Sequence, residues 1–298
     1  MQNQTGNSGK SSTASKWLMG CGIGCGVVII IVILVGVSGY FFIKNIVKGF
    51  EETEAIMDTL TEKYGKMSDF YPDPDGVIRA GQLEVFLAVR DSTAKARERL
   101  ERAMRILADM DQEDQSGEEP SPSVLTKIKT GIELVPLIAE FIKARSQSLL
   151  DNGMGMGEYY YLYVIVYYSW LGKSPADGPP FDIMDEGDEE GTIIWRERRR
   201  EHMEERLDLN LRRLNRQILP MLYNQYEKLT EGGAPGTKEE WRAALEAEIE
   251  AMESDSFRLP WQDGLPEALG ASLNYYRQRL EDSYSELVNP IEMSYRQR

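Results

Sequence analysis

Residues 158–170 read EYYYLYVIVYYSW and place six tyrosines in an otherwise apolar run. A helix of this length spans about 20 Å, which is too short to cross the roughly 30 Å hydrocarbon core of a bilayer. The segment therefore predicts a helix at the centre of a folded core, whose tyrosine hydroxyls reach polar partners or the domain rim. An aromatic ligand cavity is the alternative, and its candidate lining residues are Tyr159, Tyr160, Tyr163 and Tyr167.

Apolar residues recur at helical spacing on both sides of this segment. Thr237 opens a capping box, Thr-Lys-Glu-Glu, and Pro266 stands at the start of a last apolar repeat that ends at Pro290. No stretch shows the alternation of a half-buried strand. The soluble part is therefore predicted to be an antiparallel bundle or hairpin array of six or seven helices. Besides residues 158–170, helices are expected over residues 80–110 and 192–229 and after residues 122, 237 and 265.

Two stretches of loop composition divide these helices. Residues 111–122 are acidic and contain proline, and residues 172–191 are rich in Gly, Pro and Asp. The second loop separates a helical subdomain, residues 71–171, from a long-helix subdomain, residues 192–298. We expect the two subdomains to pack together as one domain.

Residues 17–43 contain no charged side chain and read WLMGCGIGCGVVIIIVILVGVSGYFFI. A helix of this length spans roughly 40 Å, and Trp17 and Tyr40 stand where interfacial aromatics belong. The segment predicts a single-pass transmembrane anchor, preceded by a flexible tail over residues 1–16, so the whole chain belongs to the all-α class. The alternatives are a signal peptide cleaved after residue 39 and lipid attachment at Cys21.

Small residues in the anchor predict a contact between two copies of the chain. The spacing of four residues within the pairs Gly20/Gly24 and Gly22/Gly26 lets two membrane helices approach closely, so a homodimer is expected through this face. After the anchor, residues 44–70 form a juxtamembrane helical stalk with one apolar stripe. The stripe fits either a coiled coil between two chains or packing on the chain's own domain, and the short length favours the second.

The charge of the chain is strongly asymmetric. The net charge is −15, but residues 1–44 hold three lysines and no acid, so the remainder carries 31 Lys+Arg against 49 Asp+Glu, or −18. This sign argues against nucleic-acid binding. A short lysine-bearing leader before an apolar run is typical of export signals, so the domain is expected on the extracytoplasmic, periplasmic side. The basic run KARERLERAMR, residues 95–105, is interpreted as a solvated helix face.

Residues that could carry chemistry are sparse. His202 is the only histidine, and both cysteines lie in the anchor, so no cofactor and no metal site is expected. The leading hypothesis is a membrane-anchored, non-enzymatic helical protein that binds or scaffolds a protein partner. The alternatives are a sensor or regulatory ectodomain with a small-molecule cavity at the tyrosines, and a carboxylate-dependent hydrolase using Glu158, Asp182 or Asp185. A closed tyrosine core counts against the sensor, and two buried carboxylates facing each other favour the hydrolase.

Overall fold

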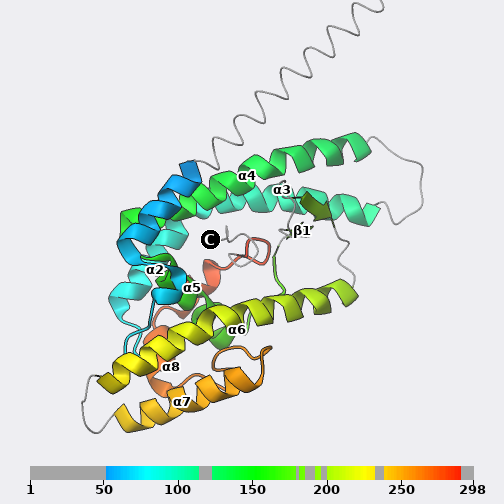
Figure 1. Ribbon diagram of the computed structural model, residues 1–298. Coiled ribbons are helices and arrows are strands. Elements are labelled where there is room, and N and C mark those ends of the chain that lie inside the picture. Colours follow the sequence, from blue (N-terminus) through cyan, green and yellow to red (C-terminus); the bar gives the residue numbers. More distant parts are fainter. Residues whose placement is uncertain are drawn as a thin grey trace, which may run out of the picture. The chain divides into compact units, whose positions relative to one another are not determined.

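Figure 1 shows the computed structural model, which describes residues 52–113, 123–178, 181–184, 192–195, 200–231 and 238–289. Residues 49–298 form one compact unit. Its described part is helical except for one short pair of strands, which confirms the all-α class at this level. The predicted anchor, residues 17–43, lies outside the described residues, and so do its four glycines. Within the described ranges, the structure contains no helix with the length and apolarity that a membrane crossing requires.

The order of elements is as follows. A helix over residues 52–64 and the 3-10 helix η1 (Met67–Asp69) come first. The elements after them are α2 (Ala80–Ser92), α3 (Ala94–Glu113), α4 (Ser123–Asn152), α5 (Met156–Tyr163), the π-helix η3 (Val164–Trp170), strands β1 (Phe181–Met184) and β2 (Thr192–Trp195), α6 (Arg200–Glu231), α7 (Lys238–Ser254), α8 (Glu267–Asn274) and α9 (Arg277–Asp282).

Successive long helices pair as antiparallel hairpins (Figure 1). Between the end of α2 and the end of α4, the hydroxyls of Ser92 and Ser148 lie 2.7 Å apart. Further along the hairpin, Arg99 of α3 forms an ion pair with Glu140 of α4. Residue numbers rise on one helix as they fall on the other, which defines the antiparallel direction. Helices α6 and α7 form the second hairpin, in which Asn215 donates to the Met252 carbonyl over 2.8 Å.

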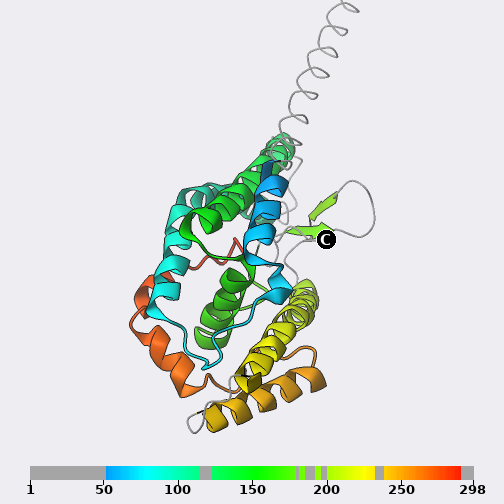
Figure 2. The same ribbon diagram turned by 60° about the vertical axis from the view of Figure 1, so that its left-hand side comes forward.

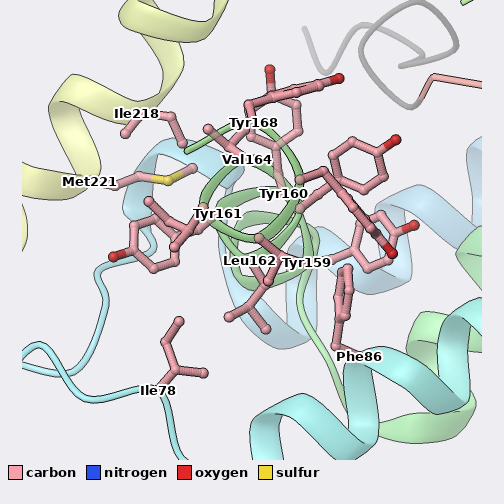
Figure 3. Packing of buried hydrophobic residues seen from close by; sticks show 14 of the residues in the cluster. Ile78, Phe86, Tyr159, Tyr160, Tyr161, Leu162, Val164, Tyr168, Ile218 and Met221 are labelled. Carbon is pink, nitrogen blue, oxygen red and sulfur yellow. The ribbon is translucent and has the colours of Figure 1, made fainter. Parts of the chain in front are cut away.

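Helix α5 lies at the centre of the core (Figures 2 and 3). All of its residues except Glu158 are buried. Figure 3 shows that its side chains point in every direction, with Phe86 of α2 beside Tyr159 and with Ile218 and Met221 of α6 on another side. A helix that is apolar on all faces must be covered on all faces. The prediction that residues 158–170 form a central core helix is therefore confirmed.

The helix predicted over residues 80–110 is in fact two helices that meet at Thr93. The Thr93 hydroxyl donates to the carbonyls of Val89 and Arg90, at 2.9 and 3.0 Å. Side-chain hydroxyls that bond to the preceding turn compete with the helix's own hydrogen bonds. Helix α3 then extends to Glu113, into the stretch predicted as a loop.

The prediction that no strand occurs is wrong in one place. Residues 192–195 pair antiparallel with residues 181–184, in the register Asp182 to Ile194, instead of starting a helix. The helix begins at Arg200 and runs to Glu231. The run TIIW is rich in β-branched residues, and a nearby partner segment lets it pair as a strand. The last predicted helix is also divided, into α8 and α9, and α9 ends at Asp282 rather than at Pro290.

Candidate functional site

The π-helix η3 sets the arrangement of the tyrosines. This segment is wider than an α-helix, and it places Tyr167 and Tyr168 beside Tyr163, the last residue of α5. The ring centroid of Tyr163 lies 4.5 Å from that of Tyr167 and 5.7 Å from that of Tyr168. Both pairs have the edge-to-face geometry that aromatic rings prefer. Short π-helical segments occur often at functional sites, so the groups around this one are candidates for a functional site.

Of the six tyrosines in residues 158–170, three have hydroxyls with polar partners. The Tyr167 hydroxyl lies 2.7 Å from Ser283 Oγ, and because that serine donates to the Leu280 carbonyl, Tyr167 is the donor. Tyr168 donates to Asn289 Oδ1 over 2.9 Å. These bonds tie η3 to the segment that follows α9. In contrast, the hydroxyls of three other buried tyrosines have no partner among the described residues: Tyr160, Tyr161 and Tyr163.

The third hydroxyl with a partner, that of Tyr159, accepts a hydrogen bond from a buried arginine. Arg90 of α2 is 0% exposed, and its Nη1 donates to the Tyr159 hydroxyl over 3.2 Å. Its Nη2 donates to the Ser283 carbonyl. The guanidinium carbon lies 5.4 Å from the centre of the Tyr163 ring and 5.6 Å from that of Tyr167, which is cation–π distance.

Two more arginines lie near Arg90. Arg97 of α3 is 8% exposed and donates to the Arg90 carbonyl over 3.3 Å. Arg145 of α4 is 2% exposed. Burial lowers the pKa of both Arg97 and Arg145, and the positive charge of Arg90 lowers each of them further. Because free guanidinium groups titrate above pH 12, all three remain charged at neutral pH.

The predicted aromatic cavity residues lie in this packed core. Tyr159, Tyr160, Tyr163 and Tyr167 are between 0 and 3% exposed. Ring contacts fill the space between them, and the ring centroids of Tyr159 and Phe86 lie 5.3 Å apart. This closed packing is the observation that counts against a small-molecule cavity formed by the tyrosines alone.

A shallow pocket lies on another side of α5, and none of the four predicted tyrosines lines it. Glu158, Tyr161 and Asp73 are among its lining residues, and its volume of about 10 Å³ holds one water molecule. The Glu158 carboxylate accepts a hydrogen bond from Gln82 Nε2 over 3.1 Å. Burial raises the pKa of Glu158, and this bond partly offsets the effect.

The acids proposed for a hydrolase do not form a described pair. Asp182 belongs to β1, and Asp185 lies outside the described residues. Asp73 shares the pocket with Glu158, but its side chain is 38% exposed and lies 3.4 Å from Arg79 Nε. No group of His, Cys, Asp and Glu that could hold a metal ion occurs in the part of the chain that the structure describes.

Burial of the three arginines was not predicted, and the expectation that Arg97 lies on a solvated face is wrong. A signal was present in each case. Arg90 follows the buried Phe86 by four residues, Arg97 precedes the buried Leu100 by three, and Arg145 follows the buried Ile142 by three. Each arginine therefore stands on the apolar stripe of its helix, at a spacing that predicts burial. A charged residue in such a position is the informative exception.

The unpaired hydroxyl of Tyr163 leads to a testable difference between neighbouring tyrosines. Tyr163→Phe removes a buried hydroxyl that has no partner in the described part, so we expect the free energy of unfolding to rise by about 1 kcal/mol. Tyr167→Phe breaks the bond to Ser283 and should lower it by about 1 kcal/mol. Denaturant unfolding followed by tryptophan fluorescence measures both. Equal effects of the two variants would contradict this hydrogen-bond assignment.

Comparison with known proteins gives no match: no protein-family model, no curated protein and no solved structure is significantly similar to this chain.

Proposed function

We propose that this chain is a membrane-anchored, non-enzymatic helical module that binds a protein partner close to the bilayer surface. The observation that carries the proposal is the position of the helix over residues 52–64. It follows the apolar segment 17–43 by only eight residues, and it is built into the core of the domain.

The contacts of this helix are internal to the chain. Thr53, Met57 and Leu60 are buried, with Leu60 only 1% exposed. The Ser146 hydroxyl of α4 donates to the Met57 sulfur over 3.3 Å, and Lys143 of the same helix forms an ion pair with Glu52. The apolar stripe therefore packs on the chain's own domain over these residues, which was the favoured alternative for the stalk.

This packing limits how far the domain can lie from a membrane. Nine peptide units connect residue 43 to residue 52, and even a fully extended chain of that length spans only about 30 Å. With residues 17–43 in the bilayer, as we propose, the domain would stay within that distance of the lipid surface. The proposal includes the orientation expected from the lysine-bearing tail, with the domain on the periplasmic side, and a homodimer through Gly20, Gly22, Gly24 and Gly26.

The surroundings of Glu158 support the proposal of a binding protein rather than a hydrolase. The side chain of this predicted catalytic acid is held by Gln82, and the pocket beside it accommodates one water molecule and no substrate. A general acid must reach the proton that it transfers in a bound substrate. In this structure the carboxylate serves the packing of α5 against α2.

The anchor is tested by fractionation of cells that express the full chain. We expect the protein to pellet with membranes, to resist an alkaline carbonate wash and to be released by detergent. The double variant Ile29→Arg/Ile33→Arg should lower the membrane-bound fraction severalfold, because an arginine at the bilayer centre costs about 3 kcal/mol. The matched control Ser12→Arg/Ser15→Arg adds the same charge outside the apolar run and should pellet like the wild type.

Recovery of the intact full-length protein in the aqueous fraction would overturn the proposal. Orientation is tested separately, by adding protease to intact spheroplasts. Digestion of the domain is the expected result, and survival of the domain would place it in the cytoplasm.

A further inference from the structure

We propose that Arg90, Arg97 and Arg145 form a buried site for a small oxyanion that carries a carboxylate or phosphate group. The site lies where the ends of α2 and α4 and the start of α3 meet the tyrosines of α5 and η3. This inference goes beyond the proposed function and is independent of the membrane anchor.

The three arginines place positive charge inside the core. A guanidinium stays protonated in proteins, and moving it out of water costs several kcal/mol unless an opposite charge compensates. No carboxylate of the described residues forms an ion pair with any of the three arginines. The partners of Arg90 and Arg97 are neutral: the Tyr159 hydroxyl and two backbone carbonyls.

The tyrosines do not supply the missing negative charge. Burial raises the pKa of Tyr163 well above its ordinary value and outweighs the opposing effect of Arg90. Burial likewise raises the pKa of Tyr167. Both phenols are therefore neutral at neutral pH, and they contribute ring faces and hydroxyl dipoles only.

The half-buried Glu101 does not neutralise the site either. Charges in solvent are screened over about 8 Å at physiological ionic strength. Glu101, which raises the pKa of Arg97, has a smaller effect on it than Arg90, which lowers it. Arg90 and Arg97 thus have only neutral hydrogen-bond partners among the described residues, and Glu101 offsets the positive charge of Arg97 in part.

Two of the arginines also have unused hydrogen-bond donors. The Nε atoms of Arg90 and Arg145 are buried and have no hydrogen-bond partner among the described residues. Arg145 makes no described hydrogen bond or ion pair at all, although it is only 2% exposed. Buried polar groups are nearly always paired. A guanidinium presents its donors in a planar fork that matches the two oxygens of a carboxylate or phosphate.

Two of the arginines, Arg90 and Arg97, are held in place by the domain itself. Arg90 is fixed by two hydrogen bonds and by the ring faces of Tyr163 and Tyr167. Arg97 is tied to it through the Arg90 carbonyl. Positive groups held in place before the ligand arrives favour anion binding, because little conformational entropy remains to be lost. The chemistry selects an oxyanion, which is either free phosphate or a small carboxylate.

Thermal unfolding of the full chain in nonionic detergent, followed by tryptophan fluorescence, tests the proposal. Sodium phosphate and sodium succinate, each at millimolar concentration, are compared with sodium chloride at equal ionic strength. At a hundredfold excess over Kd, we expect the better of the two anions to raise Tm by about 5–10 °C. The comparison of the two salts distinguishes a phosphate ligand from a carboxylate ligand.

The variant Arg145→Gln removes a group that makes no described hydrogen bond, and it should abolish the anion-dependent rise. The matched control Arg279→Gln removes a surface arginine that pairs with Glu84, and it should keep the full rise. This control also corrects for general salting effects of phosphate. An equal rise in Arg145→Gln and in the wild type overturns the proposal, and so does the absence of any rise with either anion.

A direct measurement covers the case in which Arg145→Gln does not fold. Equilibrium dialysis of the wild-type chain with labelled phosphate and labelled succinate should give about one bound ion per chain for one of them. If neither ion binds, the proposed site is wrong.

Discussion

Gly157→Ala is expected to lower the free energy of unfolding by about 3 kcal/mol, at the upper end of what overpacking costs. A Cβ at this position would lie 2.5 Å from Phe70 Cβ and 2.8 Å from the Met67 backbone carbonyl oxygen. The carbonyl belongs to η1 and cannot rotate away as a side chain would. Methyl insertion must therefore push η1 from α5, and the midpoint of urea unfolding reports the loss.

A second helical glycine supplies the control for this variant. Gly270 lies in α8, and a Cβ there would meet no atom within 4 Å. Because alanine loses less backbone entropy on folding than glycine, Gly270→Ala should stabilise the protein by about 0.5–1 kcal/mol. If Gly157→Ala behaved like this control, the close approach of η1 to α5 would be wrong.

Glu248→Gln is expected to cost about 2 kcal/mol, because it weakens the charge-assisted hydrogen bonds of a buried carboxylate to a partly exposed arginine. Glu248 is 5% exposed, and its two oxygens accept from Arg258 Nε and Nη2 at 3.2 and 3.0 Å. The same carboxylate accepts the Trp261 backbone N–H over 2.8 Å. Trp261 has a φ of +57°, a conformation that residues other than glycine rarely adopt, so this bond stabilises a strained turn.

The matched control removes the other acid that binds the same arginine. Asp263 accepts from Arg258 over 2.7 Å, but its side chain is 83% exposed. Solvent-exposed ion pairs contribute about 0–1 kcal/mol, so Asp263→Asn should have a small effect. Tryptophan fluorescence follows the unfolding of both variants, because the ring centroids of Trp261 and Trp241 lie 5.5 Å apart. Equal losses in the two variants would contradict a dominant role for Glu248.

Sequence patterns predicted most helices, because the apolar residues that a helix buries recur every three or four positions along the chain. Ser123 does begin a helix, and α7 begins at Lys238, directly after the capping box residue Thr237. The breaks at Thr93 and after Asn274 were not predicted, because the apolar spacing continues across both. A hydrogen bond from a side-chain hydroxyl to the backbone, or a short turn of the chain, ends a helix without changing that apolar spacing.

The candidate site was predicted only in part, and Arg97 shows why. Read along the chain, it is one of many charges in KARERLERAMR, and the local signal that distinguishes it from Arg99 is its spacing of three residues from Leu100. In the structure, Arg99 pairs with Glu140 at the surface while Arg97 bonds to the Arg90 carbonyl in the interior. Which of the two arginines is buried depends on the face that α3 turns toward α2, and the many charges of this run obscure the apolar spacing that marks that face.

By itself, the sequence determined the helical class, the uncharged run over residues 17–43 and the central place of the tyrosine helix, because each follows from the spacing or polarity of neighbouring residues. Tertiary structure alone decided that residues 164–170 form a π-helix, that residues 181–184 pair with 192–195, and that three arginines are buried in the core. These features depend on contacts between segments that are far apart along the chain. Local propensity has no information about such contacts, and their free energies are large enough to override it.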